Sequence, residues 1–225
     1  MNDFPFATVG FDLDGTLLDT SADISHALNH ALALIGREPI PLPQARGLIG
    51  GGTRKLLDRA LDLTGGALLE TEIATLNRQL VEFYGNNIAV HSRLFPGGEA
   101  MLDALAARGV ALAVVTNKLE HLARKLLDTL GLSERFYTII GGDTLGPGRA
   151  KPAPDLLHEM VARTPRIGPV AYVGDTTYDT GAAKAAGIPC VAVSFGFCDL
   201  PPAELGARAV IDHFDELVNS LQALR

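Results

Sequence analysis

Short apolar runs and helical repeats alternate along most of this chain. The apolar runs predict buried strands at residues 7–11, 110–115, 136–140, 170–173, 188–193 and 209–211. Between them, leucine and alanine recur at the spacing of a helix face, and glycine often ends the repeat. This alternation indicates an α/β protein, in which a doubly wound parallel sheet carries helices on both faces.

The stretch from residue 20 to about residue 90 is different, because its apolar pattern is helical throughout. Helical repeats follow Thr20 and Thr53 and run again from Leu69 to Phe83, and three prolines at 39, 41 and 43 predict a turn. Only one strand precedes this stretch, so it is an insertion. We expect a core of residues 1–18 and 93–225 and an all-helical cap of residues 19–92, hinged near residues 17–20 and 91–96.

Composition and charge narrow the class of protein. Hydrophobic residues make up 47% and charged residues 20% of the chain, as is usual for a folded protein. The net charge of −7 argues against a nucleic acid partner, which requires clustered lysine and arginine. No apolar run approaches the roughly 20 residues of a membrane span, and no signal peptide is visible. We therefore expect a cytoplasmic protein, a monomer or homodimer, with Cys190 and Cys198 as reduced thiols.

Four polar clusters carry the candidate chemistry. Three of them directly follow a predicted strand, and open α/β sheets form their sites at the carboxyl ends of strands. The clusters supply carboxylates, a hydroxyl, an amide and an ammonium group, which suit a metal ion and a phosphate. The pattern therefore indicates an enzyme acting on phosphate esters. The clusters are Asp12-Leu13-Asp14-Gly15-Thr16-Leu17, Thr116-Asn117-Lys118, Lys151-Pro152 and Gly174-Asp175-Thr176-Thr177-Tyr178-Asp179.

In order and spacing, these clusters resemble the four motifs of the haloacid dehalogenase-like phosphohydrolases. The resemblance covers essentially all 225 residues and implies a Rossmann-like core with a helical cap. Gly50-Gly51-Gly52 and Gly141-Gly142-Asp143-Thr144-Leu145 further resemble the phosphoglycolate phosphatase branch. The resemblance implies a Mg²⁺-dependent phosphatase that works through an aspartyl-phosphate, with 2-phosphoglycolate as the first candidate substrate.

The resemblance also assigns roles that phosphoryl transfer requires. Asp12 would be the nucleophile, and Asp14 would protonate the leaving oxygen and then activate water. Lys151 would neutralise charge together with Mg²⁺, and Thr116 and Asn117 would bind the phosphoryl oxygens. Because dehalogenases of this family lack an acid at the second position, Asp14 argues against that activity.

The metal ligands and the cap residues complete the prediction. Mg²⁺ would be held by Asp12, the backbone carbonyl of Asp14, and Asp175. Asp179 would ligate through water or orient Lys151. In the cap, we expect Gly51, Gly52, Thr53 and Arg54 to face the core and bind a substrate carboxylate, although a flexible loop with a solvated arginine is the alternative. Lys118 would either contact the surroundings of the phosphate or be a solvated lysine at a helix start. Tyr178 would be a packing or solvent-facing residue.

Other functions remain open at this point. A phosphomutase of the β-phosphoglucomutase type would share both aspartates, and sugar phosphates, N-acetylmuramate 6-phosphate and pyrophosphate are alternative substrates. A receiver domain also has a phosphorylatable aspartate, but it would not carry Asp12-x-Asp14 beside a helical insertion. His26 and His30 lie four apart on one predicted helix and could bind a metal as a pair, but no third ligand is apparent in the sequence.

Overall fold

A six-stranded parallel sheet forms the centre of the larger domain. The computed structural model describes residues 4–164 and 166–224. The sheet has the order β5-β4-β1-β6-β7-β8, and each neighbouring pair is parallel. Its strands are β1 (Thr8–Phe11), β4 (Ala111–Val115), β5 (Thr138–Ile140), β6 (Val170–Gly174), β7 (Cys190–Val193) and β8 (Ala209–Ile211).

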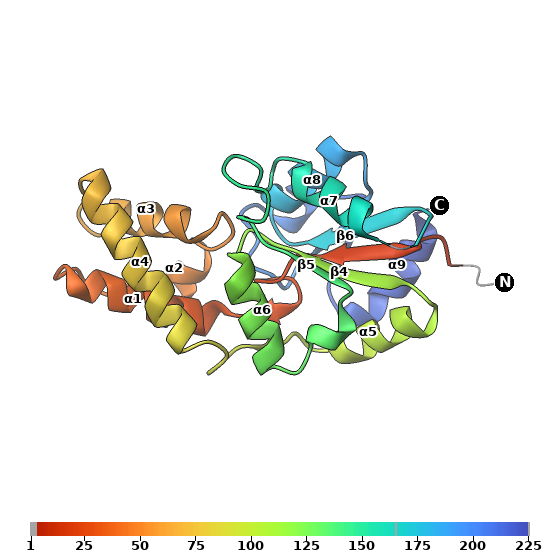
Figure 1. Ribbon diagram of the computed structural model, residues 1–225, viewed down its shortest axis with the longest axis horizontal. Helices are drawn as coiled ribbons and strands as arrows, with labels where there is room; N and C mark the ends of the chain where they lie inside the picture. The colour runs from red at the N-terminus through yellow and green to blue at the C-terminus, as the bar shows by residue number, and fades with distance from the viewer. Residues whose placement is uncertain (1–3, 165, 225) are drawn as a thin grey trace.

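Helices cover both faces of this sheet, as the alternating pattern predicts (Figure 1). On one face lie α7 (Asp155–Arg163) and α8 (Thr177–Ala186), and on the other α5 (Gly98–Ala107), α6 (Glu120–Thr129) and α9 (Leu217–Ala223). Strand β4 shows why both faces need cover, because all five of its residues are buried. Leu112 and Val114 join the core on one side, and Ala113 and Val115 join the core under α7 and α8.

Three short 3₁₀ helices lie in the connections of the core: Ser133–Arg135, Pro202–Glu204 and Phe214–Glu216. The first corrects the prediction of a strand from residue 136, because the turn it makes delays β5 until Thr138. The last corrects the prediction of one helix from residue 214, because α9 itself begins at Leu217.

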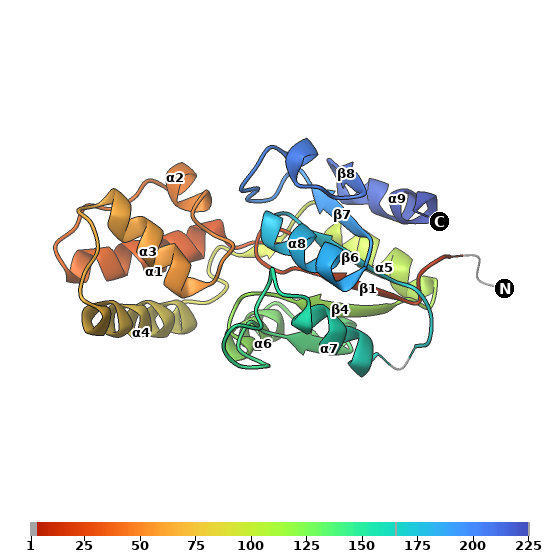
Figure 2. The ribbon, with the colours of Figure 1, turned by 90° about the horizontal axis from the view of Figure 1, so that it is seen from above.

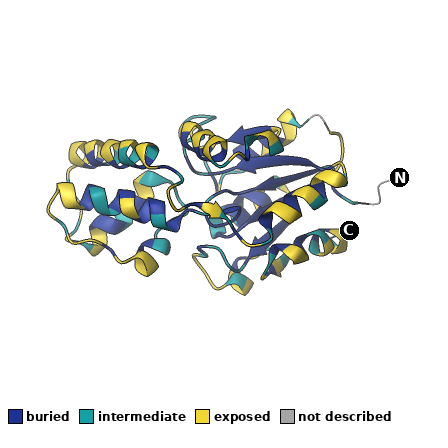
Figure 3. Cartoon of the chain, turned by 90° about the horizontal axis from the view of Figure 1, so that it is seen from below, coloured by how far each residue is buried: buried dark blue, intermediate teal, exposed yellow. Residues whose placement is uncertain are grey.

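Four helices follow the first strand of the core and form a separate layer, seen at the left of Figures 1 and 2. They are α1 (Ser21–Leu34), α2 (Leu42–Arg46), α3 (Thr53–Leu63) and α4 (Glu70–Asn86). Helix α1 packs on α4 and α2, and α3 packs on α4. Figure 3 shows that these helices bury the sides that face each other and expose the opposite sides.

Two details of this region were absent from the prediction. The proline-rich segment contains a helix, α2, because Pro43 occupies its first turn, where a missing N–H has no cost. The two connections to the core pair as a short antiparallel ribbon, β2 (Leu18–Asp19) with β3 (Arg93–Leu94). Among the described residues, no helix has both the length and the apolar character to cross a membrane.

Candidate active site

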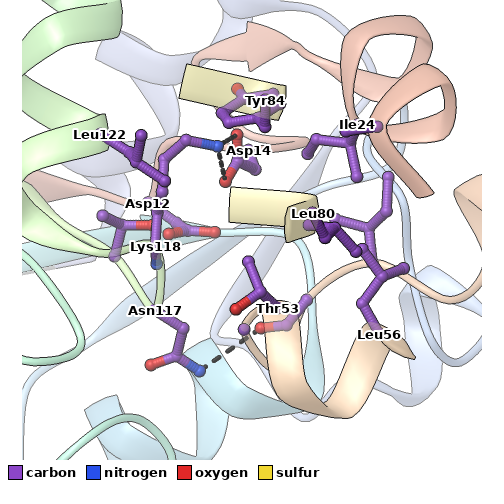
Figure 4. A pocket seen from close by; sticks show the side chains of 15 residues that line it. Asp12, Asp14, Ile24, Thr53, Leu56, Leu80, Tyr84, Asn117, Lys118 and Leu122 are labelled. Atoms are coloured by element: carbon purple, nitrogen blue, oxygen red, sulfur yellow. Dashed lines mark hydrogen bonds and ion pairs between the residues drawn. The ribbon is translucent and has the colours of Figure 1, made fainter. Parts of the chain in front are cut away.

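The sheet order brings the polar clusters together. Strands β4, β1 and β6 are adjacent, and Thr116, Asp12 and Asp175 follow their respective carboxyl ends. Lys151 comes from the connection before α7, and its peptide bond to Pro152 is cis. A pocket opens between these ends and the cap, and Figure 4 shows Asp12 and Asp14 on its core side opposite Thr53 and Leu80 of the cap.

Asp12 is buried, with 7% of its surface exposed. Its Oδ1 lies 2.9 Å from Lys151 Nζ, which is an ion-pair distance, but this oxygen receives no well-aligned hydrogen bond within the described structure. Burial raises the pKa of Asp12 to about 6, although Lys151 opposes this effect. Such a carboxylate has a lone pair available and is poorly stabilised as an anion without a further cation.

Lys151 is held by a fixed set of partners. Its Nζ donates to Asp179 Oδ1 at 2.6 Å, to the Tyr172 hydroxyl at 2.8 Å and to the Val115 carbonyl at 3.0 Å. Burial alone would lower the pKa of this lysine, but the charges of Asp12 and Asp179 outweigh it and raise the pKa above its usual range. The ammonium group is therefore charged and fixed beside Asp12.

Asp175 is completely buried beside the same pair. Its Oδ1 accepts a hydrogen bond from Thr16 Oγ1 at 2.8 Å, and its Oδ2 accepts one from the Phe197 N–H at 2.7 Å. Burial, followed by the charges of Asp179 and Asp12, raises its pKa well above the usual range. Gly15 permits this approach, because its φ is 86° and a Cβ there would lie 2.3 Å from Asp175 Oδ2.

Asp12, Asp175 and Asp179 have oxygens within 4.8 Å of one another and could hold a metal ion. Asp179 differs from the other two, because donors already surround it. Its Oδ2 accepts from the Thr176 hydroxyl at 2.6 Å and the Thr176 N–H at 3.0 Å, which caps α8, and its Oδ1 accepts from Lys151. These contacts fit the predicted role of orienting Lys151. Asp12 and Asp175 have oxygens with spare lone pairs, so they fit a cation better.

Lys118 is not a solvated lysine, which corrects one of the two readings of the sequence. Only 5% of its side chain is exposed, and its Nζ lies 2.9 Å from each carboxylate oxygen of Asp14 (Figure 4). The ammonium also lies 4.4 Å from the centre of the Tyr84 ring, which belongs to cap helix α4. Thr20 Oγ1 donates to Asp14 as well, at 2.8 Å. No sequence pattern indicates the pairing of Lys118 with Asp14, because the two residues are about a hundred positions apart.

Thr116 and Asn117 both line the pocket. Thr116 is buried, and its Oγ1 accepts a hydrogen bond from the Lys118 N–H at 3.2 Å, so its own hydroxyl proton stays available to a ligand. Asn117 Nδ2 donates to the Lys151 carbonyl at 3.0 Å and to the Gly50 carbonyl at 3.4 Å. Asn117 therefore links its own cluster and that of Lys151 to the loop of the cap that precedes α3, residues 50–52 (the cap loop).

The cap loop reaches the pocket only in part. Gly50, Gly52 and Thr53 line it, and the φ of Gly52, 87°, turns the chain into α3. Gly51 packs on Tyr178 instead, since a Cβ there would lie 3.0 Å from the Tyr178 hydroxyl. That hydroxyl also accepts a hydrogen bond from Arg59 Nη2 at 3.1 Å. Tyr178, predicted to pack or face solvent, is a contact between core and cap.

Arg54 does not face the core, which corrects the prediction for this residue. It is 44% exposed and forms ion pairs with Asp58 at 2.9 Å and Glu70 at 2.5 Å, both within the cap. The physical reason is helix geometry, because successive residues are rotated by about 100°. Thr53 and Leu56 share the face of α3 that lines the pocket, and Arg54 is turned to another side.

Comparison with known proteins places this chain. The sequence model of the family described as haloacid dehalogenase-like hydrolase matches residues 9–193. The chain belongs to this family. A protein named phosphoglycolate phosphatase from Agrobacterium fabrum is 39% identical over 214 residues, covering 94% of this chain and 90% of the relative. One of the same name from Xylella fastidiosa is 40% identical over 200 residues, covering 87% and 83%.

Solved structures share this architecture over nearly the whole length of the chain. A crystal structure of a predicted phosphoglycolate phosphatase from Haemophilus somnus superposes with a TM-score of 0.86 at 31% identity, covering 95% of this chain and 97% of that one. A crystal structure of CbbY from Rhodobacter sphaeroides in complex with phosphate superposes with a TM-score of 0.78 at 25% identity, covering 96% and 99%. Both confirm the predicted fold class, a parallel α/β sheet with helices on its faces.

Proposed function

We propose that this protein is a Mg²⁺-dependent phosphatase that hydrolyses a small phosphate monoester, 2-phosphoglycolate, through an aspartyl-phosphate. One observation carries the proposal. The buried carboxylate of Asp12 borders the pocket, and its Oδ1 lies 2.9 Å from the Lys151 ammonium. A carboxylate in that position can attack a phosphoryl group whose charge the ammonium offsets.

The remaining core residues fit the steps of this reaction. Asp14 would give a proton to the leaving oxygen and later take one from the attacking water, and it borders the same pocket as Asp12. The free hydroxyl proton of Thr116 and the ammonium of Lys151 would hold the phosphoryl oxygens. Attack converts the Asp12 carboxylate to an acyl phosphate and releases the alcohol; water then releases phosphate and restores the carboxylate.

The acidic cluster fits a hard divalent cation. Asp12, Asp175 and Asp179 are buried together, and Lys151 is the one ammonium in contact with Asp12 and Asp179 in the described structure. Mg²⁺ prefers oxygen ligands that include one or two carboxylates. We assign the ligands as Asp12, Asp175 and the backbone carbonyl of Asp14, with Asp179 outside the first coordination shell. The ion would neutralise charge on the phosphoryl oxygens.

The pocket walls favour a small substrate that carries few hydroxyl groups. Six apolar residues line the pocket: Ile24, Ala27, Ile49, Leu56, Leu80 and Leu122. From the cap, only Thr53, Tyr84 and the glycines of the loop offer polar atoms among the described lining residues. A sugar phosphate brings several hydroxyl groups that would lose water without finding partners there. The named relatives favour 2-phosphoglycolate for the same site.

We further propose that Lys118, in place of Arg54, binds the substrate carboxylate. In 2-phosphoglycolate, one carbon separates the carboxylate from the leaving oxygen, which must lie next to Asp14. Lys118 is the side chain that supplies a cation at that point, 2.9 Å from Asp14. Its burial among apolar residues strengthens an ion pair relative to one in water. The N–H groups of Gly52 and Thr53 at the start of α3 would add donors from the cap.

A panel of phosphorylated metabolites tests the substrate and the reaction type. Phosphate release should be fastest with 2-phosphoglycolate, should require Mg²⁺, and should be lost in the Asp12→Asn variant. Faster release from a hexose phosphate, N-acetylmuramate 6-phosphate or pyrophosphate would overturn the substrate. Conversion of a sugar 1-phosphate to its 6-phosphate without release would identify a phosphomutase instead. Oligomeric state, monomer or homodimer, and a cytoplasmic location stay predictions.

A further inference from the structure

A second group of side chains that could hold a metal ion lies outside the catalytic pocket, at the point where the chain returns from the cap to the core. Asp23 comes from the first turn of α1, His26 from the next turn, and His91 from the segment just before β3. One ligand atom of each residue lies within 4.8 Å of the other two. The two imidazole rings meet edge to face, with centroids 5.3 Å apart.

The carboxylate of this group is fixed in place. Asp23 is buried, and its Oδ2 accepts hydrogen bonds from the Ser92 hydroxyl at 2.6 Å and the Ser92 N–H at 2.9 Å. The His91 N–H is shared between both oxygens at 3.0 Å. Within the described part of the chain, Oδ1 receives only that one shared bond, so it keeps a lone pair for another partner. Hydrogen bonds from outer partners orient a ligating carboxylate in the same way.

The two histidines offer nitrogen ligands, whereas the acidic cluster of the catalytic pocket offers oxygen ligands alone. Both are exposed, so their rings can rotate without repacking a core. Ligands around a tetrahedral Zn²⁺ lie about 3.4 Å apart, given bond lengths near 2.1 Å, so small ring rotations close the group around an ion. Two imidazoles and one carboxylate form a donor set typical of Zn²⁺, Co²⁺ and Ni²⁺, whereas Mg²⁺ prefers oxygen alone.

His30 does not belong to this group. The sequence suggested a pair of His26 with His30, but the His30 ring stacks on Phe83 with centroids 4.0 Å apart. The partners of His26 are Asp23, three residues before it, and His91, which the chain brings back to the base of α1. This third ligand is far away in sequence, so periodicity within one helix could not reveal it.

We propose that Asp23, His26 and His91 form a binding site for a divalent transition metal ion of the zinc type. An ion held there connects the helix that enters the cap with the segment that leaves it. Because the unfolded chain does not hold these residues together, binding stabilises the folded cap. The site is independent of the phosphatase proposal, since none of its residues lines the catalytic pocket.

Titration calorimetry with Zn²⁺ and Co²⁺ tests the site in the full-length protein, with excess Mg²⁺ present to occupy the oxygen-lined site. Wild type should bind one more equivalent of Zn²⁺ than the His26→Ala/His91→Ala double variant. His30→Ala is the matched control on the same helix, and it should keep that equivalent. With Co²⁺, wild type and the control should show a visible absorption band that the double variant lacks.

Two further measurements separate a built site from loose surface binding. Ser92→Ala removes a donor that orients Asp23 and should weaken Zn²⁺ binding about 10- to 100-fold. Zn²⁺ should raise the melting temperature of wild type and His30→Ala but not that of the double variant, whose Mg²⁺-dependent phosphatase activity reports that it is folded. Equal Zn²⁺ binding by wild type and the double variant would overturn the proposal, as would binding that Ser92→Ala leaves unchanged.

Discussion

Replacing Lys118 with methionine tests how the pocket selects its substrate. Methionine keeps the unbranched side chain that packs beside Tyr84 but removes the ammonium group 2.9 Å from Asp14. Two effects are expected. Asp14 loses a partner that positions it, which slows every substrate, and a substrate carboxylate loses the cation that we assign to it. Only the second effect depends on the substrate.

The size of each effect follows from the contacts. A hydrogen bond to a charged group contributes about 1.5–3 kcal/mol, and Lys118 is 5% exposed, so the upper part of this range applies. A loss of about 2–3 kcal/mol corresponds to roughly 30- to 150-fold in kcat/KM. For the shared effect, a misplaced general acid should cost about 10-fold, part of the 10²–10⁴ that proton transfer contributes.

The assay compares two substrates that differ only in the carboxylate. Steady-state phosphate release is measured for 2-phosphoglycolate and for ethyl phosphate, which keeps the ester and lacks the acid group. Lys118→Met should reduce the ratio of their kcat/KM values by roughly 30- to 150-fold. Arg54→Ala is the matched control, because Arg54 is exposed and paired with Asp58 and Glu70, and it should leave the ratio unchanged.

The outcomes distinguish the possible roles of Lys118. Equal losses on both substrates would mean that Lys118 acts only through Asp14, and no loss on either would remove it from the site. A change of the kcat/KM ratio in Arg54→Ala would mean that Arg54 binds the substrate carboxylate after all. Thermal unfolding of each variant checks that the loss of a buried charge has not unfolded the protein.

Three further predictions concern Asp12 and the metal. Asp12→Asn should lower kcat by several orders of magnitude while the protein stays folded, and retention of more than about a tenth of the activity, a loss below about 1.4 kcal/mol, would exclude Asp12 as the nucleophile. Exhaustive chelation with EDTA should abolish phosphate release and Mg²⁺ should restore it, with Asp175→Ala requiring more Mg²⁺ or resisting rescue; full activity after chelation would remove the metal from the mechanism. Stability without metal should also depend on pH: burial raises the pKa of Asp12 from 3.8 to about 6 in the fold, so protonation favours the folded state, and ionisation of Asp12 should lower the free energy of unfolding as pH rises from about 4 to above 6. Denaturant unfolding in EDTA should show that Asp12→Asn lacks this pH-dependent loss of stability. If the free energy of unfolding changes with pH equally in the two proteins, the raised pKa of Asp12 is refuted.

The sequence by itself determined the fold class and the composition of the core site. Strand residues such as those of β1 and β4 are buried on both sides of the sheet, so their apolar runs are visible without any partner. Polar residues directly after such runs lie at one edge of a parallel sheet, which brings Asp12, Thr116 and Asp175 to one place. A local pattern sufficed because each residue needs only its own strand to be positioned.

Tertiary structure decided which charges meet. Lys118 and Arg54 both lie beside motif residues, but Lys118 is buried against Asp14 and Arg54 pairs with Glu70 within the cap, because the direction of a side chain depends on how the cap helices pack over the core. Packing of the cap likewise decides the hydrogen bond from Arg59 to Tyr178 and the contact between the His91 and His26 rings. These contacts join segments distant in sequence, so the spacing of apolar and polar residues along the chain cannot reveal them. They form only when burial of the apolar faces of α1, α3 and α4 fixes where the cap lies.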